Sequence, residues 1–399
     1  MRVLYSFPHR IGASRICRTA WYLVAGVASA GVDVVAAVGS VARPLPDSVE
    51  VVETLARGRV KIPYRAVGSR RMFAIHDHLV ARWLRRHREE IDLVHAWPLG
   101  ALETLRVAKE LDIPTLLERP NAYTRYAYEV VRQESERLGV ELPANHEHAF
   151  NARVLAKEEA EFDLADRLLC PSEFAAWTFR QAGYSDEKLV RHFYGVDTEV
   201  FFPGDRQSGQ FTAVFVGVAA VRKGLHFALE AWQRSSASSS GRFLIAGDIL
   251  PDYRRILEPW LAHPSVVVLG HSNAVPELMR EAHVLVLPSI EEGCALVCTE
   301  AMASGCVPVV SDACTDLCRA NDNALVHSVG DVDALSADLS LVSEDGATWR
   351  RLRDACLASR DAISWDAAAE RLAEVYADAV STQANLPRSA PAVGIRGLS

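Results

Sequence analysis

Two glutamates, Glu292 and Glu300, stand eight positions apart after an apolar run, and Gly293 directly follows the first of them. The pattern places Glu292 in a loop and Glu300 about two turns later in a helix, so both carboxylates can face one cleft. Gly293 lets the backbone approach a ligand closely, and the amides at the helix start favour an anion. A carboxylate accepts paired hydrogen bonds from neighbouring hydroxyls. The segment therefore predicts contacts to sugar hydroxyls beside a phosphate site; the alternative is a helix with two solvated acids.

The elements that must position these groups follow from the hydrophobic pattern. Short apolar runs alternate with amphipathic stretches along the whole chain, which is typical of β-α units around parallel sheets. The predicted strands are Val3–Ser6, Val34–Val38, Leu93–Trp97, Thr115–Leu117, Arg167–Cys170, Leu189–Phe193, Ala213–Val216, Phe243–Ala246, Val266–Leu269, Val284–Leu287, Val307–Val310 and Ala324–His327. The predicted helices include Ala20–Val32, Leu102–Leu111, Ala144–Phe162 and Asp366–Val380.

A polar seam at 203–209 separates two complete β-α series. We therefore predict an α/β fold of two facing, doubly wound Rossmann-like domains. Ligands of such domains bind at the carboxyl ends of the strands, so the chemistry is expected in the central cleft. The stretch 385–399, which is rich in Ala, Pro, Gly and Ser, is predicted to be a disordered tail.

Composition excludes several classes of protein. The 399 residues carry 43 Lys and Arg against 51 Asp and Glu, a net charge of -8, so nucleic acid is not an expected partner. Eight cysteines without a C-x-x-C pair predict reduced, buried thiols in a cytoplasmic protein, and no metal site is assigned. The apolar stretch Ala20–Val32 is too short for a bilayer span, which needs about 20 residues.

The segment around the two glutamates resembles the group-1 family of retaining GT-B glycosyltransferases, whose hallmark is an E-x7-E motif. The residues that match this motif are Glu292-Gly293-Cys294-Ala295-Leu296, Glu300-Ala301-Met302-Ala303, Gly305 and Pro308-Val309-Val310. Further matches are Val216-Gly217 with Arg222-Lys223-Gly224, Tyr194-Gly195-Val196-Asp197 with Phe201 and Pro203, Asp166 with Pro171-Ser172-Glu173-Phe174, and Trp365 with Tyr376. The resemblance covers most of the chain.

The resemblance implies a GT-B architecture. An N-terminal acceptor-binding domain would span 1–200, and a C-terminal nucleotide-sugar donor-binding domain would span 201–364. A last helix at 365–384 would cross back to the first domain.

The resemblance also implies roles for the donor-side residues. Glu300 would hold the ribose hydroxyls, and Glu292 would contact the donor sugar. The diphosphate would be neutralised by Lys223 and by the backbone of Gly293, Cys294, Ala295 and Leu296, next to the loop that contains Gly217. Fixed cations and amides of this kind stabilise a departing diphosphate. We therefore predict Glu292, Lys223 and Arg222 as the catalytic residues.

Two departures from the family pattern concern the reacting groups. The family commonly has Arg directly after the loop glycine, where this chain has Val218, and we expect Arg222 to substitute for it. The family also places a His at the end of the acceptor-domain strand that here runs into Glu118, Arg119 and Asn121. No histidine occurs there, so one of these three residues is expected to contact the reacting sugar.

Other candidates on the acceptor side are Gly12 and His95. Gly12 corresponds to the glycine-rich loop of the family, and His95 matches its D-x-V-H element. His146 and His148 are expected to be surface residues, because their spacing does not align them on one helix face.

These observations predict a retaining, hexosyl-type glycosyltransferase. It would move a sugar from a nucleotide-diphosphate donor, with a UDP-sugar favoured, to an acceptor hydroxyl by front-face substitution. The nucleotide-sugar is a substrate, so no cofactor is predicted, and the lack of a D-x-D element predicts no metal. The alternatives are a weak or inactive nucleotide-sugar-binding scaffold protein, and a sugar-nucleotide epimerase or a phosphorylase.

A basic segment at 57–88 bears on the acceptor. It carries a net charge of +9 and contains the apolar residues Met72, Phe73, Ile75, Leu79, Trp83 and Leu84. Helices that lie on anionic membranes combine bases and apolar residues in this way. The segment predicts a peripheral contact with the inner membrane face, or a lipid-linked or otherwise anionic acceptor. The alternative is a solvated helix whose apolar face packs on its own domain.

Overall fold

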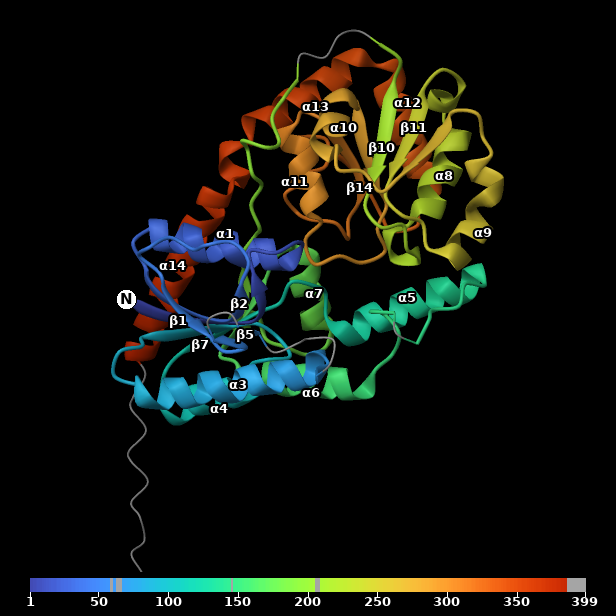
Figure 1. Ribbon diagram of the computed structural model, residues 1–399. Helices are drawn as coiled ribbons and strands as arrows, with labels where there is room; N and C mark the ends of the chain where they lie inside the picture. Colours follow the sequence, from blue (N-terminus) through green and yellow to red (C-terminus); the bar gives the residue numbers. More distant parts are fainter. Residues whose placement is uncertain (58–59, 62–66, 145, 205–208, 386–399) are drawn as a thin grey trace, which may run out of the picture.

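The computed structural model describes residues 1–57, 60–61, 67–144, 146–204 and 209–385. Two α/β domains face each other, and the long helix α14 (Trp365–Ala384) runs from the second domain along the first (Figure 1). Each domain contains a parallel sheet covered by helices. The predicted fold class is therefore confirmed.

The first domain is built on a seven-stranded parallel sheet with the strand order β3-β2-β1-β6-β7-β8-β9. Its strands are β1 (Arg2–Ile11), β2 (Asp33–Val41), β3 (Glu50–Glu53), β6 (Leu93–Ala96), β7 (Thr115–Glu118), β8 (Arg167–Cys170) and β9 (Leu189–Arg191). Consecutive residues of β1 and β2 are buried, as expected of strands that have helices on both faces. A short antiparallel pair, β4 (Ala56–Arg57) and β5 (Val60–Lys61), stands apart from this sheet.

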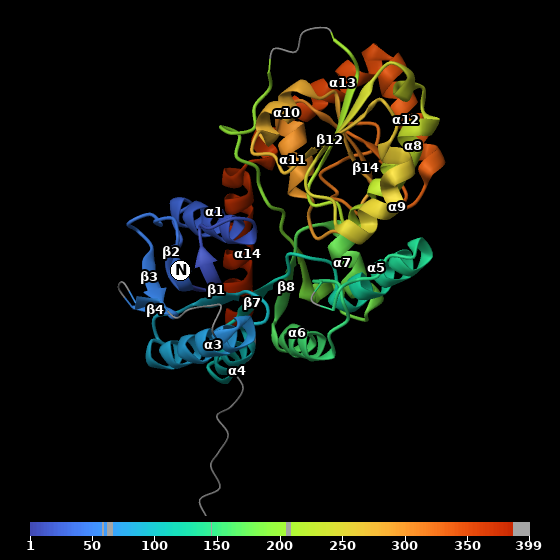
Figure 2. The same ribbon diagram turned by 45° about the vertical axis from the view of Figure 1, so that its right-hand side comes forward.

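Helices cover both faces of the first sheet. One face carries α1 (Ile16–Ser29) together with α14. The other face carries α3 (Ser69–Arg86), α4 (Leu102–Glu110), α6 (Ala152–Leu164) and α7 (Glu173–Gln181). The remaining helix, α5 (Thr124–Leu138), extends from this domain to a position beneath the second one (Figure 2).

The second domain has a six-stranded parallel sheet with the order β12-β11-β10-β13-β14-β15. Its strands are β10 (Thr212–Val216), β11 (Arg242–Ala246), β12 (Val266–Gly270), β13 (Val284–Leu287), β14 (Val307–Ser311) and β15 (Leu325–His327). Its helices are α8 (Leu225–Arg234), α9 (Pro251–Leu261), α10 (Val275–Glu281), α11 (Leu296–Ala303), α12 (Val332–Glu344) and α13 (Gly346–Ala358). Short 3₁₀ turns occur at η1 (Asp186–Lys188), η2 (Val221–Lys223), η3 (Ser236–Ser239) and η4 (Asp361–Ile363).

All twelve predicted strands are present, although several of their ends differ by a few residues. The predicted helix Ala144–Phe162 is wrong at its start, because α6 begins at Ala152. The side chain of Asn151 caps this helix by accepting a hydrogen bond from the backbone N–H of Val154 at 3.2 Å. The elements β3, β4, β5 and α5 were not predicted from the sequence.

Helix α14 connects the two domains. The side chain of Ser364 caps its start, and Leu372 and Tyr376 are buried in the core of the first domain. The helix start lies tightly against the linker between the domains, since a Cβ on Gly195 would stand 2.4 Å from the backbone of Trp365. Apart from Asn385, the predicted tail 385–399 lies outside the described residues.

Candidate active site

A cleft of about 1320 Å³ lies between the two domains, at the carboxyl ends of strands from both sheets. This volume exceeds the roughly 300–1,000 Å³ of typical small-molecule sites, so the cleft is large enough for a nucleotide-sugar. Every donor-side residue predicted from the sequence lines it, namely Gly217, Arg222, Lys223, Glu292, Gly293, Cys294, Ala295, Leu296 and Glu300.

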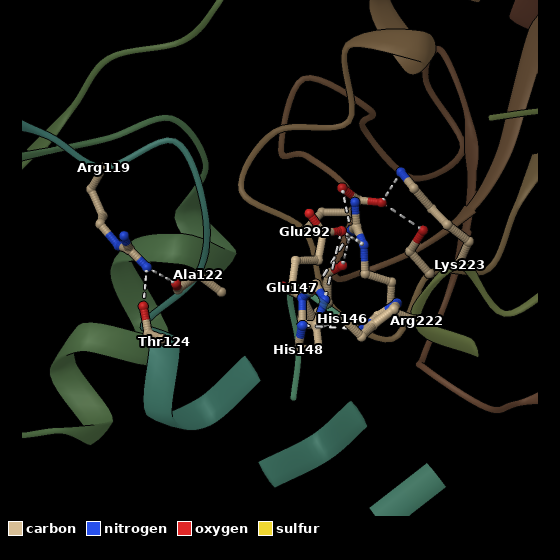
Figure 3. Close-up of polar contacts among 11 residues, drawn as sticks. Arg119, Ala122, Thr124, His146, Glu147, His148, Arg222, Lys223 and Glu292 are labelled. Carbon is tan, nitrogen blue, oxygen red and sulfur yellow. Dashed lines mark hydrogen bonds and ion pairs between the residues drawn. The ribbon is translucent and has the colours of Figure 1, made fainter. Parts of the chain in front are cut away.

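Glu292 lies at the centre of a buried group of charges on the donor side. One of its carboxylate oxygens accepts hydrogen bonds from the ammonium of Lys223 and from Ser289 Oγ, the latter at 2.9 Å. Its other oxygen lies 3.2 Å from the guanidinium of Arg222. Figure 3 shows Arg222 and Lys223 converging on this carboxylate from the same loop. The structure thus brings together the three residues that the sequence analysis predicted to be catalytic.

These contacts fix the charge state of the group. Burial alone would raise the pKa of Glu292, but the charges of Lys223 and Arg222 outweigh it and lower this pKa to about 2. Burial opposes the charge on Arg222, yet the carboxylates of Glu292, Glu291 and Glu147 raise its pKa above the usual value. The site therefore holds two fixed cations in the absence of ligand, with carboxylates as their counter-charges.

Tight backbone packing holds the loop that carries the two cations. Gly224, which follows Lys223, has φ +66°, and a Cβ there would lie 1.9 Å from the carbonyl oxygen of Pro288. The N–H of Ile290 donates to the carbonyl of Arg222 at 2.7 Å. Val218, which occupies the position of the usual family arginine, is 44% exposed. Arg222 instead supplies a guanidinium beside Glu292.

Glu300 lies in α11, one turn after the residues that open this helix. Burial raises the pKa of its carboxyl to about 7, and the positive charge of Arg18 opposes that shift. Within the described residues, no side chain donates a hydrogen bond to this carboxylate, although it lines the cleft. Glu300 is thus an acceptor that a ligand with hydroxyl groups can use.

The turn before α11 brings the two domains into contact. A Cβ on Gly293 would lie only 1.8 Å from the carbonyl oxygen of Pro120, which belongs to the first domain. The backbone of the turn can approach this closely because glycine has no side chain.

Only part of the predicted acceptor side lies on the cleft. Arg119 and Asn121 line it. Arg119 is 2% exposed, and its guanidinium donates to Thr124 at 2.6 Å (Figure 3). It also donates to Glu158 at 2.8 Å, so it is already paired. Asn121 is exposed.

His95, Glu118 and Gly12 are not brought to the cleft. Both His95 and Glu118 are fully buried, and His95 Nε2 lies 3.1 Å from the carboxylate of Glu118. Tyr376 of α14 contacts His95 Nδ1 at 2.7 Å, so this histidine belongs to the core of the first domain. Gly12 has φ +77°, and a Cβ there would meet the Cβ of Arg43 at 2.5 Å, which gives it a structural role in its turn.

A group of residues that was not predicted from the sequence reaches the cleft from the segment after α5. His146 and Glu147 line the cleft, and His148 Nε2 lies 2.8 Å from the carboxylate of Glu291. Figure 3 shows all three near Arg222. The expectation that both histidines are simple surface residues is therefore corrected. Their sequence carries no periodic signal, and their partners come from the other domain.

The first domain also contributes an aromatic wall, formed by His9, Phe73 and Trp97. The ring centroids of His9 and Phe73 are 4.7 Å apart, and the indole N–H of Trp97 donates to the hydroxyl of Tyr5 at 2.7 Å. Burial lowers the pKa of His9 to about 4, so this wall is uncharged at neutral pH. It can pack against the apolar face of a sugar ring.

Helix α3, from the predicted membrane segment, divides its apolar residues between two faces. Met72, Phe73 and Leu84 are buried in the first domain, whereas Ile75 and Leu79 are 38% and 37% exposed. Arg71, Arg82 and Arg86 are also exposed. The side chains of 57–66 lie outside the described part of the chain. Among the helices that the structure describes, none is long and apolar enough to cross a bilayer.

The eight cysteines are all free thiols, and six of them are buried. In the described ranges, no group of three or more His, Cys, Asp or Glu residues is arranged to hold a metal ion.

The fold and the cleft define a two-domain protein of the GT-B class. Residues 17–200 match the family model for Glycosyltransferase Family 4, and residues 210–345 match the model for Glycosyl transferases group 1. The chain belongs to the group 1 glycosyltransferases.

Known proteins support the same class. O-antigen chain mannosyltransferase B of Escherichia coli is 31% identical over 166 residues, which cover 39% of this chain and 42% of that protein. The match therefore spans less than half the length of that relative. The structure of a sucrose-phosphate synthase from Thermosynechococcus elongatus has a TM-score of 0.67 at 17% identity, covering 96% of this chain and 99% of that one. The structure of WaaG, a glycosyltransferase involved in lipopolysaccharide biosynthesis, has a TM-score of 0.63 at 15% identity, covering 94% and 99%.

Proposed function

We propose that the protein transfers a sugar from a nucleoside-diphosphate donor to an acceptor hydroxyl with retention of configuration. The observation that supports this most directly is the pairing of Arg222 and Lys223 with the buried carboxylate of Glu292. Two cations held beside a glycine turn form a site for a leaving diphosphate, and Glu300 offers an acceptor for ribose hydroxyls.

In the proposed reaction, the acceptor oxygen attacks the anomeric carbon from the face that the diphosphate leaves. The bond between the anomeric carbon and the phosphate oxygen breaks as the new glycosidic bond forms. The leaving phosphate oxygen takes the acceptor proton, so no protein base is required. Lys223, Arg222 and the backbone amides of the turn after Glu292 stabilise the charge that develops on the diphosphate.

The donor is proposed to be a UDP-sugar. A structural neighbour, HepE of Anabaena, has been solved with UDP, with UDP and glucose, and with UDP-glucose. The E. coli relative is a mannosyltransferase, which makes mannose the second candidate for the transferred sugar. The nucleotide-sugar is a substrate in this proposal, and Arg222 and Lys223 supply the positive charge beside its diphosphate.

The acceptor is proposed to be a lipid-linked or otherwise anionic saccharide. The aromatic wall of His9, Phe73 and Trp97 would pack against a sugar ring, and the exposed basic face of α3 would lie on an anionic membrane surface. The inner membrane face in the cytoplasm is the proposed location of this contact.

Thermal shift with UDP, GDP, ADP and CDP tests the donor site. A ligand at about 100 times its dissociation constant adds roughly 2.7 kcal/mol of stability. We expect one diphosphate to raise the melting temperature and the Glu300→Ala variant to lose most of that shift. The cognate nucleotide-sugar is then incubated with enzyme, and NMR reports the anomer of the sugar released or transferred.

Retention of the donor anomer in the first product supports the mechanism, whereas inversion contradicts it. If the nucleotide binds but prolonged incubation releases no sugar, the protein is a nucleotide-sugar-binding scaffold. An isomerised donor sugar would identify an epimerase instead.

A further inference from the structure

Helix α5 starts in the first domain and ends against the second. Tyr123, just before the helix, is buried in the core of the first domain, whereas Val130 and Leu138 pack on the core of the second. Figures 1 and 2 both show α5 lying beneath α8 and α9. Its position therefore links the two domains at the rim of the cleft.

A chain of hydrogen bonds runs from α5 to the cleft. Glu134 of α5 contacts His226 Nε2 at 2.8 Å, and the hydroxyl of Tyr253 contacts His226 Nδ1 at 2.6 Å. The same hydroxyl accepts the backbone N–H of His226 at 2.9 Å. His226 and Tyr253 are 3% and 1% exposed, and Tyr253 lines the cleft.

One assignment of protons satisfies every bond in this chain. His226 donates its Nε2–H to the Glu134 carboxylate, and the Tyr253 hydroxyl donates to the unprotonated Nδ1. Arg137 also donates to Glu134, so the carboxylate has a second charged partner. Buried bonds to a charged carboxylate are stronger than neutral ones, so the chain holds its members in fixed positions.

His226 is well placed to transmit this constraint to the diphosphate site. It lies in the first turn of α8, three residues after Lys223, where backbone N–H groups lack partners within the helix. Tyr253 supplies the partner for its N–H. The tightly packed Gly224 lies between them, so a shift of His226 moves the loop that contains Arg222 and Lys223.

We propose that the chain Glu134, His226 and Tyr253 is an interdomain positioning device, which sets the loop of Arg222 and Lys223 for the donor diphosphate according to the placement of the first domain. Glu134 acts through His226 and is a positioning residue. The inference rests on the proposed function only in naming the diphosphate as the ligand of that loop.

Hydrogen exchange tests the link without any nucleotide. We compare wild type with Glu134→Ala, Tyr253→Phe and the control Glu136→Ala, which removes an exposed carboxylate from the same helix. Amides of 222–228 should exchange faster in Glu134→Ala and Tyr253→Phe, and at the wild-type rate in Glu136→Ala. Glu134→Gln keeps an acceptor oxygen for His226 and should restore most of the protection.

A double-mutant cycle on UDP affinity, measured by calorimetry, then tests the consequence. Glu134→Ala should weaken UDP binding by about tenfold. Tyr253→Phe should then reduce UDP affinity much less in the Glu134→Ala background than in wild type, because both substitutions break the same chain of hydrogen bonds. Additive effects, or equal exchange in Glu134→Ala and Glu136→Ala, would overturn the proposal. If wild type binds no UDP, the proposed donor is wrong, and the exchange rates still decide whether the link exists.

Discussion

Glu292 shows at the scale of one residue how the site is prepared for a diphosphate. Its carboxylate pairs with both Lys223 and Arg222 in a buried cluster, and Arg222 has Glu291 and Glu147 as further counter-charges. A bound diphosphate can replace this carboxylate as the counter-anion of Lys223 and Arg222. Both cations are then already in position when the reaction begins.

The variant Glu292→Gln is expected to bind nucleoside diphosphate at least as tightly as wild type but to turn over more slowly. Without ligand it should be less stable by roughly 3 kcal/mol, because a buried pair that loses one partner leaves unbalanced charge. The pKa of Glu292 is lowered to about 2, so this contribution is full above pH 4.5 and is lost as the pH falls towards 2. Urea unfolding and calorimetry measure both effects. Wild-type turnover in Glu292→Gln would remove this residue from the mechanism.

Glu300 makes a prediction about pH. Burial raises its pKa to about 7, so the carboxylate is partly protonated at neutral pH. A ribose diol donates hydrogen bonds, which the ionised form accepts better, so nucleotide affinity should rise between pH 6 and pH 8. The folding stability of the free protein should depend on pH in the opposite direction. The raised pKa of Glu300 stabilises the fold at low pH, and this stabilisation is lost as the pH rises from 4.5 to 7.

Glu300→Gln is the control for this prediction. It should bind nucleotide more weakly than wild type, and its affinity should depend less on pH. The comparison distinguishes the ionisation of Glu300 from the ionisation of the nucleotide phosphate. Parallel pH profiles for the two proteins would show that Glu300 does not contact the ligand.

The donor-side residues could be predicted from the sequence because they lie within two short segments whose spacing is set by one loop and one helix. His148 and Glu147 could not be, because their partners Glu291 and Arg222 belong to the other domain. His95 and Glu118 lie near the carboxyl ends of β6 and β7, yet tertiary packing buries both of them, and Tyr376 of α14 contacts His95. Local pattern gives no information on such contacts.

At the scale of elements, the exposed face of α3 leads to a membrane prediction. The protein should float with anionic liposomes and not with neutral ones, and recovery should fall at high salt. Arg82→Glu combined with Arg86→Glu should weaken binding by more than about 30-fold, since each base near the surface contributes about 1 kcal/mol. Equal recovery with both lipids would favour an acceptor that is not at a membrane.

The matched control reverses two charges on the second domain. Arg350 and Arg351 of α13 are exposed bases, far in sequence from α3. Arg350→Glu with Arg351→Glu changes the net charge by the same amount, so it should leave flotation largely unchanged.

The turn before α11 gives a second prediction at this scale. Gly293→Ala would place a Cβ within 1.8 Å of the carbonyl oxygen of Pro120, so the domains must separate locally. A shift of about 1 Å can cost roughly 100-fold in rate. We expect transfer to fall by that order while nucleotide affinity changes less. Gly204→Ala is the control, because its Cβ would meet only the side chain of Arg280, at 3.2 Å. A fully active Gly293→Ala enzyme would show that this contact opens during turnover.

The strands were the most predictable elements, since buried parallel strands are short apolar runs between turns. Helix α5 was missed for a physical reason. It is rich in Glu and Arg, and the few apolar residues that anchor it, such as Val130 and Leu138, pack against the second domain. The start of α6 was also wrongly predicted, because Asn151 ends the preceding loop and caps the helix with its side chain.

At the scale of the whole molecule, each domain covers part of the other's core. Helix α14 follows the second domain in sequence but packs into the first, and α5 belongs to the first but packs on the second. The contact of Arg191 with both carboxylate oxygens of Asp316, at 2.6 Å, adds an ion pair between the domains. The core of the first domain therefore includes α14, which follows the second domain in sequence, and the core of the second domain is partly covered by α5 of the first.

This exchange of helices predicts that the protein unfolds in a single calorimetric transition. If so, a nucleotide that binds the second domain stabilises the first as well, and the whole transition should move up by about 3 °C at 100 times the dissociation constant. Removing α14 by ending the chain at Ser364 should expose the apolar groove that holds Leu372 and Tyr376, and should abolish cooperative melting of both domains. Two resolved transitions in the full chain, of which nucleotide shifts only one, would mean that the domains are energetically independent despite the shared helices. In variants that keep either Trp97 of the first domain or Trp232 of the second as the single tryptophan, fluorescence would then change at different temperatures.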